Sequence, residues 1–176
     1  PVLPKPPECR DCPAYGDGQG FVPDDMKEGT EVCIICQNPG ADEEAGRRYL
    51  GNEQWEPHPC VPLIGKTGRV WERGYLPLAG LDRSEVSTGN IIRCRLDHKD
   101  KLPPLNQKIV RQMIEHCNRA HFHPPESTRV FVAMGESAYY GLTSLQHDFN
   151  GWRGYVHPYR PLHAATVPPL PTRVWT

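Results

Sequence analysis

Seven cysteines are the residues of this sequence best suited to bind a metal: Cys9, Cys12, Cys33, Cys36, Cys60, Cys94 and Cys117. Their number is odd and no export leader is visible, which favours metal binding or burial over disulfides. Cys9 and Cys12 form a C-x-x-C pair in a proline-rich segment, Cys94 follows a predicted strand, and Cys117 lies on the next predicted helix. Two local and two distant thiols are the pattern of a four-thiolate site for zinc or an iron–sulfur cluster, although spacing does not separate these from each other or from buried free thiols.

Cys33 and Cys36 also read C-x-x-C, but they lie inside a predicted strand. Residues three apart in a strand point to opposite faces, so this pair is poorly placed to chelate one ion. We therefore predict that Cys33 belongs to the core, and that Cys36 and Cys60 are core or loop residues.

The elements that must position these residues alternate between strands and helices. Short apolar runs predict strands at Glu31–Gln37, Val86–Arg93 and Arg129–Met134, and 3.6-residue periodicity predicts helices at Thr67–Ala79, at Asn106–Phe122 with Asn106 as its cap, and from Gly135 through Leu142. This order predicts an α/β fold with a parallel sheet covered on both faces. Ligands of such sheets bind at the carboxyl ends of the strands, which here are Gln37–Gly40, Asn90–Arg95 and Gly135–Ser137.

The bulk composition fits one folded domain of 176 residues, with 38% apolar and 23% charged residues. The net charge of -1 argues against broad coating of nucleic acid, but not against a small local footprint. We expect each basic residue near the motifs to be a solvated surface side chain; these are Arg47, Arg48, Lys66, Arg69, Arg93 and Arg95. No apolar run is long enough to cross a bilayer, and no leader indicates export, which favours a cytoplasmic location.

Seven segments match, in order, the motifs of one protein family: Cys9–Pro13, Gly18–Pro23, Cys36–Gly46, Pro62–Gly68, Gly80–Arg83, Thr88–Arg95 and Val132–Ala138. The sequence thereby resembles the uracil-DNA glycosylase superfamily, nearest to its iron–sulfur-containing family four and its phage relatives. The resemblance implies a three-layer αβα fold with a central, mostly parallel four-stranded sheet and an N-terminal loop region tied by a metal cluster. It also implies a [4Fe-4S] cluster on Cys9, Cys12, Cys94 and Cys117, with zinc as the alternative.

The resemblance implies removal of uracil from DNA by hydrolysis of the N-glycosidic bond, in a bacterial or phage-infected cell. Asn90 matches the asparagine that reads the base, and its amide offers both a donor and an acceptor for an imide edge. Gln37 and Asn38 match the catalytic motif, and the implied substrate-binding residues are Pro39, Gly40, Leu63 and Gly65. The implied partner is uracil-containing DNA, single- or double-stranded, with no membrane involved.

Several positions depart from the family pattern. Gln37 stands where family four has a carboxylate, but Asn38-Pro39-Gly40 resembles the N-P-G of mismatch-specific glycosylases, whose asparagine positions the water. Leu63 replaces a phenylalanine that stacks on uracil, and Tyr49 or Trp55 in the long loop before Pro62 are candidates for the missing ring. We expect Asp42, Glu43 and Glu44 to form a solvated acidic turn, with compensation for the lost carboxylate as the alternative.

The family's late His-Pro pair has no clear match. His157-Pro158 falls too early, in what is predicted to be a loop, and Val174-Trp175-Thr176 resembles the beginning of the fourth strand. We therefore expect residues 1–176 to be a single domain truncated at its C-terminus, either a monomer or part of a larger polypeptide. The alternatives are a weak or inactive glycosylase-like DNA-binding module of a replication or repair protein, and a zinc-stapled α/β protein unrelated to DNA.

Overall fold

The structure is a computed structural model that describes residues 2–16, 18–96, 107–145, 156–158 and 173–175. Its centre is a five-stranded sheet in the order β5-β2-β7-β9-β8. The strands are β2 (Val32–Cys36), β5 (Val86–Asn90), β7 (Val130–Ala133), β8 (Val156–Pro158) and β9 (Arg173–Trp175). The first four in this order are parallel and β8 pairs antiparallel with β9, so the predicted four-stranded sheet is wrong by one edge strand.

The register of the parallel strands brings their carboxyl ends to one edge. Val32 pairs with Val86 of β5 and with Val130 of β7, and Cys36 at the end of β2 pairs with Asn90 at the end of β5. The residues that follow these strands therefore face the same region, as the alternation of strands and helices predicted.

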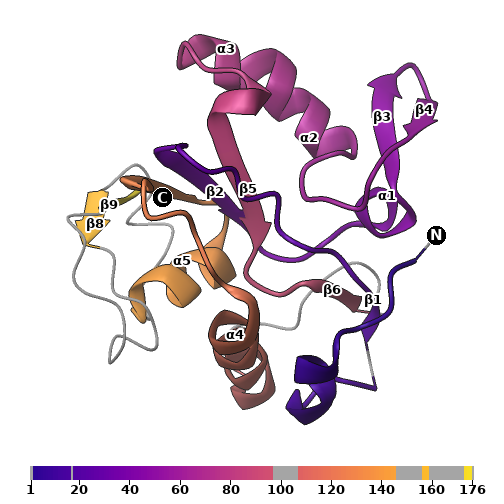
Figure 1. Cartoon of the computed structure of the whole chain (residues 1–176), viewed down its shortest axis with the longest axis vertical. Coiled ribbons are helices and arrows are strands. Elements are labelled where there is room, and N and C mark those ends of the chain that lie inside the picture. Colours follow the sequence, from indigo (N-terminus) through magenta and orange to yellow (C-terminus); the bar gives the residue numbers. More distant parts are fainter. Residues whose placement is uncertain (1, 17, 97–106, 146–155, 159–172, 176) are drawn as a thin grey trace.

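Helices cover both faces of the sheet and make three layers (Figure 1). On one face a continuous helical run comprises α2 (Lys66–Val70), the π-helical turn η2 (Trp71–Tyr75) and α3 (Leu76–Leu78), as predicted for Thr67–Ala79. On the other face lie α4 (Lys108–His121) and α5 (Glu136–Thr143). The chain enters α4 at Gln107, and Asn106, the predicted cap, lies outside the described residues.

Each face has its own core. The larger core lies between the sheet and α4 and α5 and contains Cys33, as predicted. The smaller core contains Ile34, Leu63 and Leu76, and Cys36 packs against it. Cys33 and Cys36 thus lie on opposite faces of β2, as their spacing indicated.

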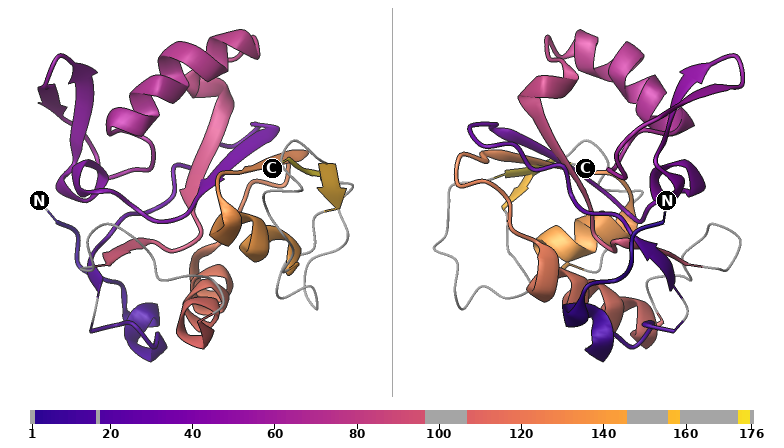
Figure 2. Two further views of the ribbon diagram at one scale, coloured as in Figure 1. Left: turned by 180° about the vertical axis from the view of Figure 1, so that it is seen from behind. Right: turned by 45° about the vertical axis from the view of Figure 1, so that its right-hand side comes forward.

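Two antiparallel pairs extend the fold beyond the predicted elements. β1 (Gly18–Phe21) pairs with β6 (Cys94–Leu96), beside the 3-10 helix η1 (Pro7–Asp11), which contacts α4 (Figure 2). The segment expected to be a long loop contains α1 (Ala41–Ala45) and a hairpin of β3 (Arg47–Gly51) and β4 (Gln54–Pro57), and the short η3 (Arg83–Glu85) precedes β5. Within the described ranges, no helix is long and apolar enough to cross a membrane.

Candidate functional site

A cavity of about 510 Å³ opens where β2, β5 and β7 end. This volume lies in the range of small-molecule pockets and suits a nucleotide base with part of its sugar. The described residues around it are Cys36, Gln37, Asn38, Gly40, Ala41, Asp42, Glu43, Leu63, Gly65, Lys66, Thr67, Asn90 and Met134. The predicted site residues Gln37, Asn38, Gly40, Leu63, Gly65 and Asn90 are thus brought together, whereas the buried Pro39 does not line the cavity.

Asn90 has the most unusual environment in this pocket. Its residue is 1% exposed, and neither its side-chain oxygen nor its nitrogen has a hydrogen-bond partner among the described residues. A buried unsatisfied polar group costs about 1–3 kcal/mol, so two such atoms on one side chain call for a partner beyond the residues that the structure describes. The amide is therefore poised to pair with a ligand that offers one donor and one acceptor.

The turn after β2 is fixed by backbone contacts and leaves Asn38 with a spare acceptor. Ile91 and Ile92 donate their backbone N–H groups to the carbonyls of Cys36 and Gln37 at 2.8 and 3.0 Å. Asn38 donates its side-chain nitrogen to the Pro39 carbonyl at 3.0 Å. Among the described contacts its oxygen is not engaged, so it is available to accept a hydrogen bond from a water molecule.

The acidic turn predicted to be solvated is largely buried, so that expectation was wrong. Glu44 is buried because its carboxylate accepts the backbone N–H of Gly20 at 2.6 Å and pairs with Arg95 at 3.4 Å. Glu43 lines the pocket and accepts the backbone N–H groups of Gly40 and Leu63. Burial raises the pKa of Glu43, and those N–H groups oppose the rise. Glu43 thus ties together the two loops that form the pocket.

Leu63 adopts a backbone conformation that side chains rarely adopt, with φ of 59°. Its carbonyl approaches Gly68 so closely that a Cβ on Gly68 would lie 1.8 Å from the oxygen, so only glycine fits there. The Leu63 side chain is buried in the smaller core. No aromatic residue is among the described residues that line the pocket, and Tyr49 and Trp55 therefore do not supply the missing ring there.

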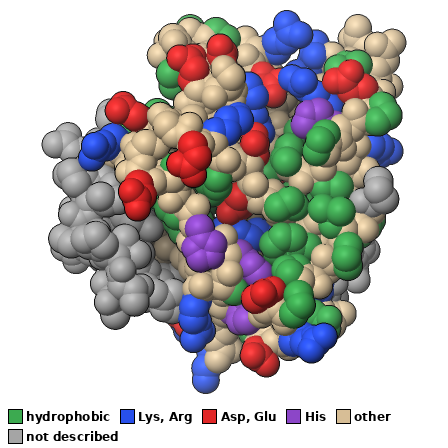
Figure 3. Space-filling model, in the orientation of Figure 1, with side chains coloured by type: hydrophobic (Ala, Val, Ile, Leu, Met, Phe, Trp, Pro, Cys, Tyr) green, Lys and Arg blue, Asp and Glu red, His purple; other side chains and the backbone are tan. Residues whose placement is uncertain are grey.

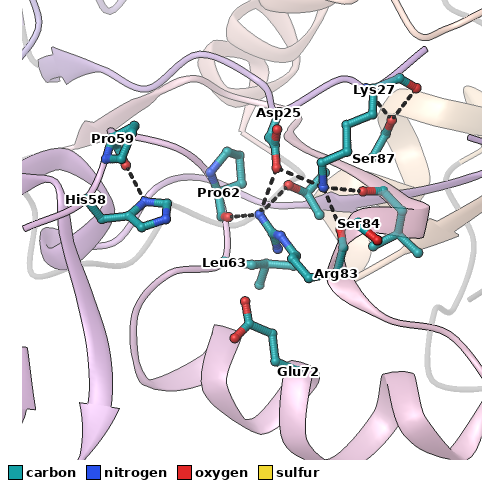
Figure 4. Close-up of polar contacts among 12 residues, drawn as sticks. Asp25, Lys27, His58, Pro59, Pro62, Leu63, Glu72, Arg83, Ser84 and Ser87 are labelled. Carbon is teal, nitrogen blue, oxygen red and sulfur yellow. Dashed lines mark hydrogen bonds and ion pairs between the residues drawn. The ribbon is translucent and has the colours of Figure 1, made fainter. Parts of the chain in front are cut away.

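Arg83 fixes the other side of the same loop (Figure 4). Its guanidinium donates to the Pro62 carbonyl at 2.8 Å and to the Thr88 hydroxyl at 3.0 Å, and it pairs with Asp25 at 3.3 Å. The Gly80–Arg83 segment noted in the sequence therefore joins the loop before Leu63 to β5, the strand that carries Asn90.

A buried ion pair between Asp24 and Arg93 holds the backbone of Asn90 in place. The Asp24 carboxylate accepts the backbone N–H of Asn90 at 3.2 Å and pairs with Arg93 at 2.6 Å. A Cβ on Gly89 would lie 2.9 Å from the Asp24 carboxylate, so this glycine leaves room for it. Burial raises the pKa of Asp24, and the Arg93 guanidinium opposes that rise. Arg93, expected at the surface, is instead 1% exposed, because Asp24 and the Cys117 carbonyl satisfy its donors.

Replacing Asp24 with asparagine should destabilise the fold, because Arg93 would then be buried beside a neutral amide. We expect the free energy of unfolding to fall by about 1.5–3 kcal/mol, the usual range for a hydrogen bond to a charged group. Urea denaturation measures this change. Asp42→Asn, which removes the half-buried partner of the exposed Arg47, is the control and should leave the midpoint nearly unchanged. An equal midpoint for the two variants would contradict the supporting role of Asp24.

A second, small cavity collects the four cysteines predicted to bind a metal. Cys9, Cys12, Cys94 and Cys117 all line it, and so do Arg93, Lys5, Ala14, Tyr15 and Phe21. All seven cysteines are free thiols. η1 contributes Cys9 and is followed directly by Cys12, β6 contributes Cys94, and α4 contributes Cys117. Cys60, which is buried near Gly46, and Cys36 lie elsewhere.

The thiols of this cavity raise one another's pKa values. Burial, followed by the neighbouring thiols of Cys117 and Cys12, raises the pKa of Cys9 to about 11. Burial and then Cys117 raise the pKa of Cys94 to about 12. The Cys9 sulfur lies 3.2 Å from Nε2 of His121, whose pKa burial and Arg93 lower to about 4. Among the described residues, no group of three or more His, Cys, Asp or Glu side chains is arranged to hold a metal ion.

Comparison with known proteins gives one similarity that bears on this site. No protein-family model matches the sequence. The chain is 28% identical over 110 residues to a type-4 uracil-DNA glycosylase of Pyrobaculum aerophilum. The matched region covers 62% of this chain and 45% of that protein, so the chain spans less than half of that relative's length. The similarity supports, at the level of the superfamily, the resemblance that the sequence motifs indicated.

Proposed function

We propose that this protein removes uracil from DNA by hydrolysing the N-glycosidic bond. The observation that carries the proposal is the Asn90 side chain, which is buried at the pocket with both polar atoms unpartnered among the described residues. The imide edge of uracil offers an N–H donor next to a carbonyl acceptor, which is the complement of an amide. The similarity to a type-4 uracil-DNA glycosylase supports the same activity.

In this proposal the target nucleotide leaves the base stack and enters the pocket. Asn90 holds the base, and Asp24 keeps the Asn90 backbone in place through its 3.2 Å hydrogen bond. Leu63 and Met134 contribute apolar surface to the pocket. As the N-glycosidic bond breaks, the side-chain N–H of Asn90 donates to the uracil oxygen on which negative charge develops. This hydrogen bond lowers the activation barrier.

Water must then reach the sugar carbon. Asn38 accepts a hydrogen bond from this water through its side-chain oxygen, because its nitrogen is held by the Pro39 carbonyl. Gln37 lines the pocket beside Asn38 and supports the water with a neutral amide. Glu43 does not replace the family carboxylate as a base, since its oxygens accept the N–H groups of Gly40 and Leu63.

Asn38→Ala should therefore lower the rate of uracil release by about a hundredfold, the lower limit for losing a group that assists proton transfer or water attack. Gln37→Ala should lower the rate by less, because the water keeps its main acceptor. Single-turnover assays with a uracil-containing oligonucleotide measure both rates. If Gln37→Ala proves the more damaging change, the assignment of the water to Asn38 is wrong.

We further propose that Cys9, Cys12, Cys94 and Cys117 hold a [4Fe-4S] cluster, with zinc as the competing occupant. The fit rests on four free thiols that line one cavity and come from three separate elements. Thiolates are the ligands of such clusters, and binding must displace their protons. When bound, the cluster supplies a cross-link between η1, β6 and α4. Arg93 lies between the two sites, because it lines this cavity and pairs with Asp24.

One observation favours a second function, in which the same pocket binds DNA with little catalysis. The described lining of the pocket contains no aromatic ring, and Leu63 occupies the place of the family's stacking phenylalanine. Loss of a stacking platform removes about 1–3 kcal/mol of base binding. A DNA-binding module with little catalysis is therefore the second candidate, and an intact protein that binds uracil-containing DNA without releasing uracil would establish it.

A further inference from the structure

The hairpin of β3 and β4 presents aromatic and basic side chains on one face, which we call the aromatic face: Arg47, Tyr49, Trp55 and the overlying Lys66. Tyr49 and Trp55 are cross-strand partners, and their ring centroids lie 5.2 Å apart. The Lys66 ammonium lies 5.3 Å from the Tyr49 ring centroid and 5.8 Å from that of Trp55. The Arg47 guanidinium lies 5.8 Å from the Trp55 ring. Trp55 remains 36% exposed and Tyr49 is half-buried, so part of this face is open to solvent.

The hairpin is held firmly against the body of the protein. Tyr49 donates its backbone N–H to the Ile64 carbonyl at 2.8 Å, and Arg48, on the opposite face of β3, pairs with Glu72 of η2 at 2.8 Å. A Cβ on Gly51 would lie 2.8 Å from the Arg69 guanidinium, so glycine allows that side chain to lie against the strand. These contacts hold the aromatic face in a fixed position relative to α2 and η2.

The aromatic face is continuous with the candidate site. Lys66 and Asp42 both line the pocket. Lys66 also lies over both rings, and Asp42 pairs with Arg47 at 2.8 Å. Figure 1 shows the hairpin standing beside α2, and Figure 3 shows basic and acidic side chains intermixed over this region. The aromatic face therefore borders the candidate site.

The charges of this surface favour a single strand over a duplex. Arg47 and Lys66 each pair with a carboxylate, so the aromatic face lacks the dense positive field that holds a duplex through its phosphates. Exposed pairs such as Lys66 with Glu53 are weak and can exchange a carboxylate for a phosphate. Aromatic rings, in contrast, bind unpaired bases by stacking, and bases within a duplex are not free to do so.

We propose that the aromatic face stacks bases of a single DNA strand next to the nucleotide held in the pocket. The proposal rests on the proposed function for the identity of that nucleotide. It assigns to this protein a preference for single-stranded DNA. In this proposal the rings that stack on bases belong to the hairpin and not to the lining of the pocket.

The test compares the double variant Y49A/W55A with the wild-type protein for binding to a labelled, uracil-free single strand and to the matching duplex, by fluorescence anisotropy. We expect the Kd for the single strand to rise about tenfold or more, the effect of losing stacking on an aromatic ring, while the Kd for the duplex stays nearly constant. Tyr75→Ala is the matched control, because Tyr75 is an exposed aromatic residue of η2, outside the hairpin, and should bind like wild type. Y49F/W55F keeps two rings and should also bind like wild type.

Circular dichroism of each variant shows whether the fold is retained. If Y49A/W55A does not fold, it is replaced in the same assay by Trp55→Leu, which keeps an apolar side chain without a ring. Unchanged single-strand binding by whichever of these two variants is folded overturns the inference, and so does an equal loss for duplex and single strand. Uracil release is measured on the same samples. If the wild-type protein releases uracil and the variant binds the single strand as wild type does, only the inference about the hairpin is wrong. Loss of single-strand binding by the variant, with no uracil release by wild type, supports the aromatic face and removes the proposed function.

Discussion

Asn90→Ala should lower the rate of uracil release by about a hundredfold or more, the effect of removing one preorganised donor from a developing anion. The same change should not destabilise the folded protein. Both polar atoms of the Asn90 side chain are buried without a partner among the described residues, so their removal relieves a desolvation penalty. Loss of activity combined with unchanged or increased stability marks a residue kept for its ligand. Uracil release and urea denaturation, measured on one preparation, test both halves.

Asn118→Ala is the matched control for this experiment. Asn118 is also buried, but its side-chain nitrogen donates to the Gly141 carbonyl at 2.8 Å. This asparagine connects α4 to α5, so its removal should reduce stability while the folded fraction releases uracil at the normal rate. A stability loss in Asn90→Ala that resembles that of Asn118→Ala would mean that Asn90 is structural, and the assignment of base recognition would fail.

Cys12→Ser should remove the metal group and much of the stability. Cys12 is the least buried of the four cysteines in the cavity, so the change itself disturbs packing little. Binding at a structural metal site contributes on the order of 10 kcal/mol to folding, so we expect the free energy of unfolding to fall by more than about 3 kcal/mol. Anaerobically purified protein should lose its bound iron and its visible absorbance, as measured by metal analysis and spectroscopy.

Cys60→Ser is the control for this prediction. Cys60 is buried outside the cavity, and its thiol donates to the Glu44 carbonyl at 3.4 Å, a bond that a serine hydroxyl can keep. This variant should retain the iron content of wild type. Stoichiometric zinc in the wild-type protein would replace the iron–sulfur assignment, and wild-type protein without any bound metal would contradict metal binding by these four thiols.

The sequence predicted the parts of the fold that depend on local pattern. The apolar runs around Ile34, Val86 and Val132 form parallel strands, because runs of this kind are buried on both faces of a sheet. Their order then placed Asn38 and Asn90 at one edge. The four cysteines predicted as metal ligands also line one cavity, and their binding of a metal stays a prediction.

Features that depend on distant partners were not predictable in this way. Arg93 was expected to be solvated, but Asp24, 69 residues earlier in the sequence, makes its burial possible. The β3–β4 hairpin was missed because its turn, Asn52-Glu53, places two non-glycine residues at positive φ instead of using the common Asn-Gly. The role of His157 stays a prediction, since its side chain lies outside the described residues.

The central claim is tested most directly by incubating the full chain, purified without oxygen, with a single-stranded oligonucleotide that contains one uracil. Alkali then cleaves the strand wherever the base has been removed. We predict cleavage at the uracil position by the wild-type protein and its loss in Asn90→Ala. A wild-type protein that keeps its metal group, binds the oligonucleotide and leaves the uracil in place would contradict the proposal that this chain is a glycosylase.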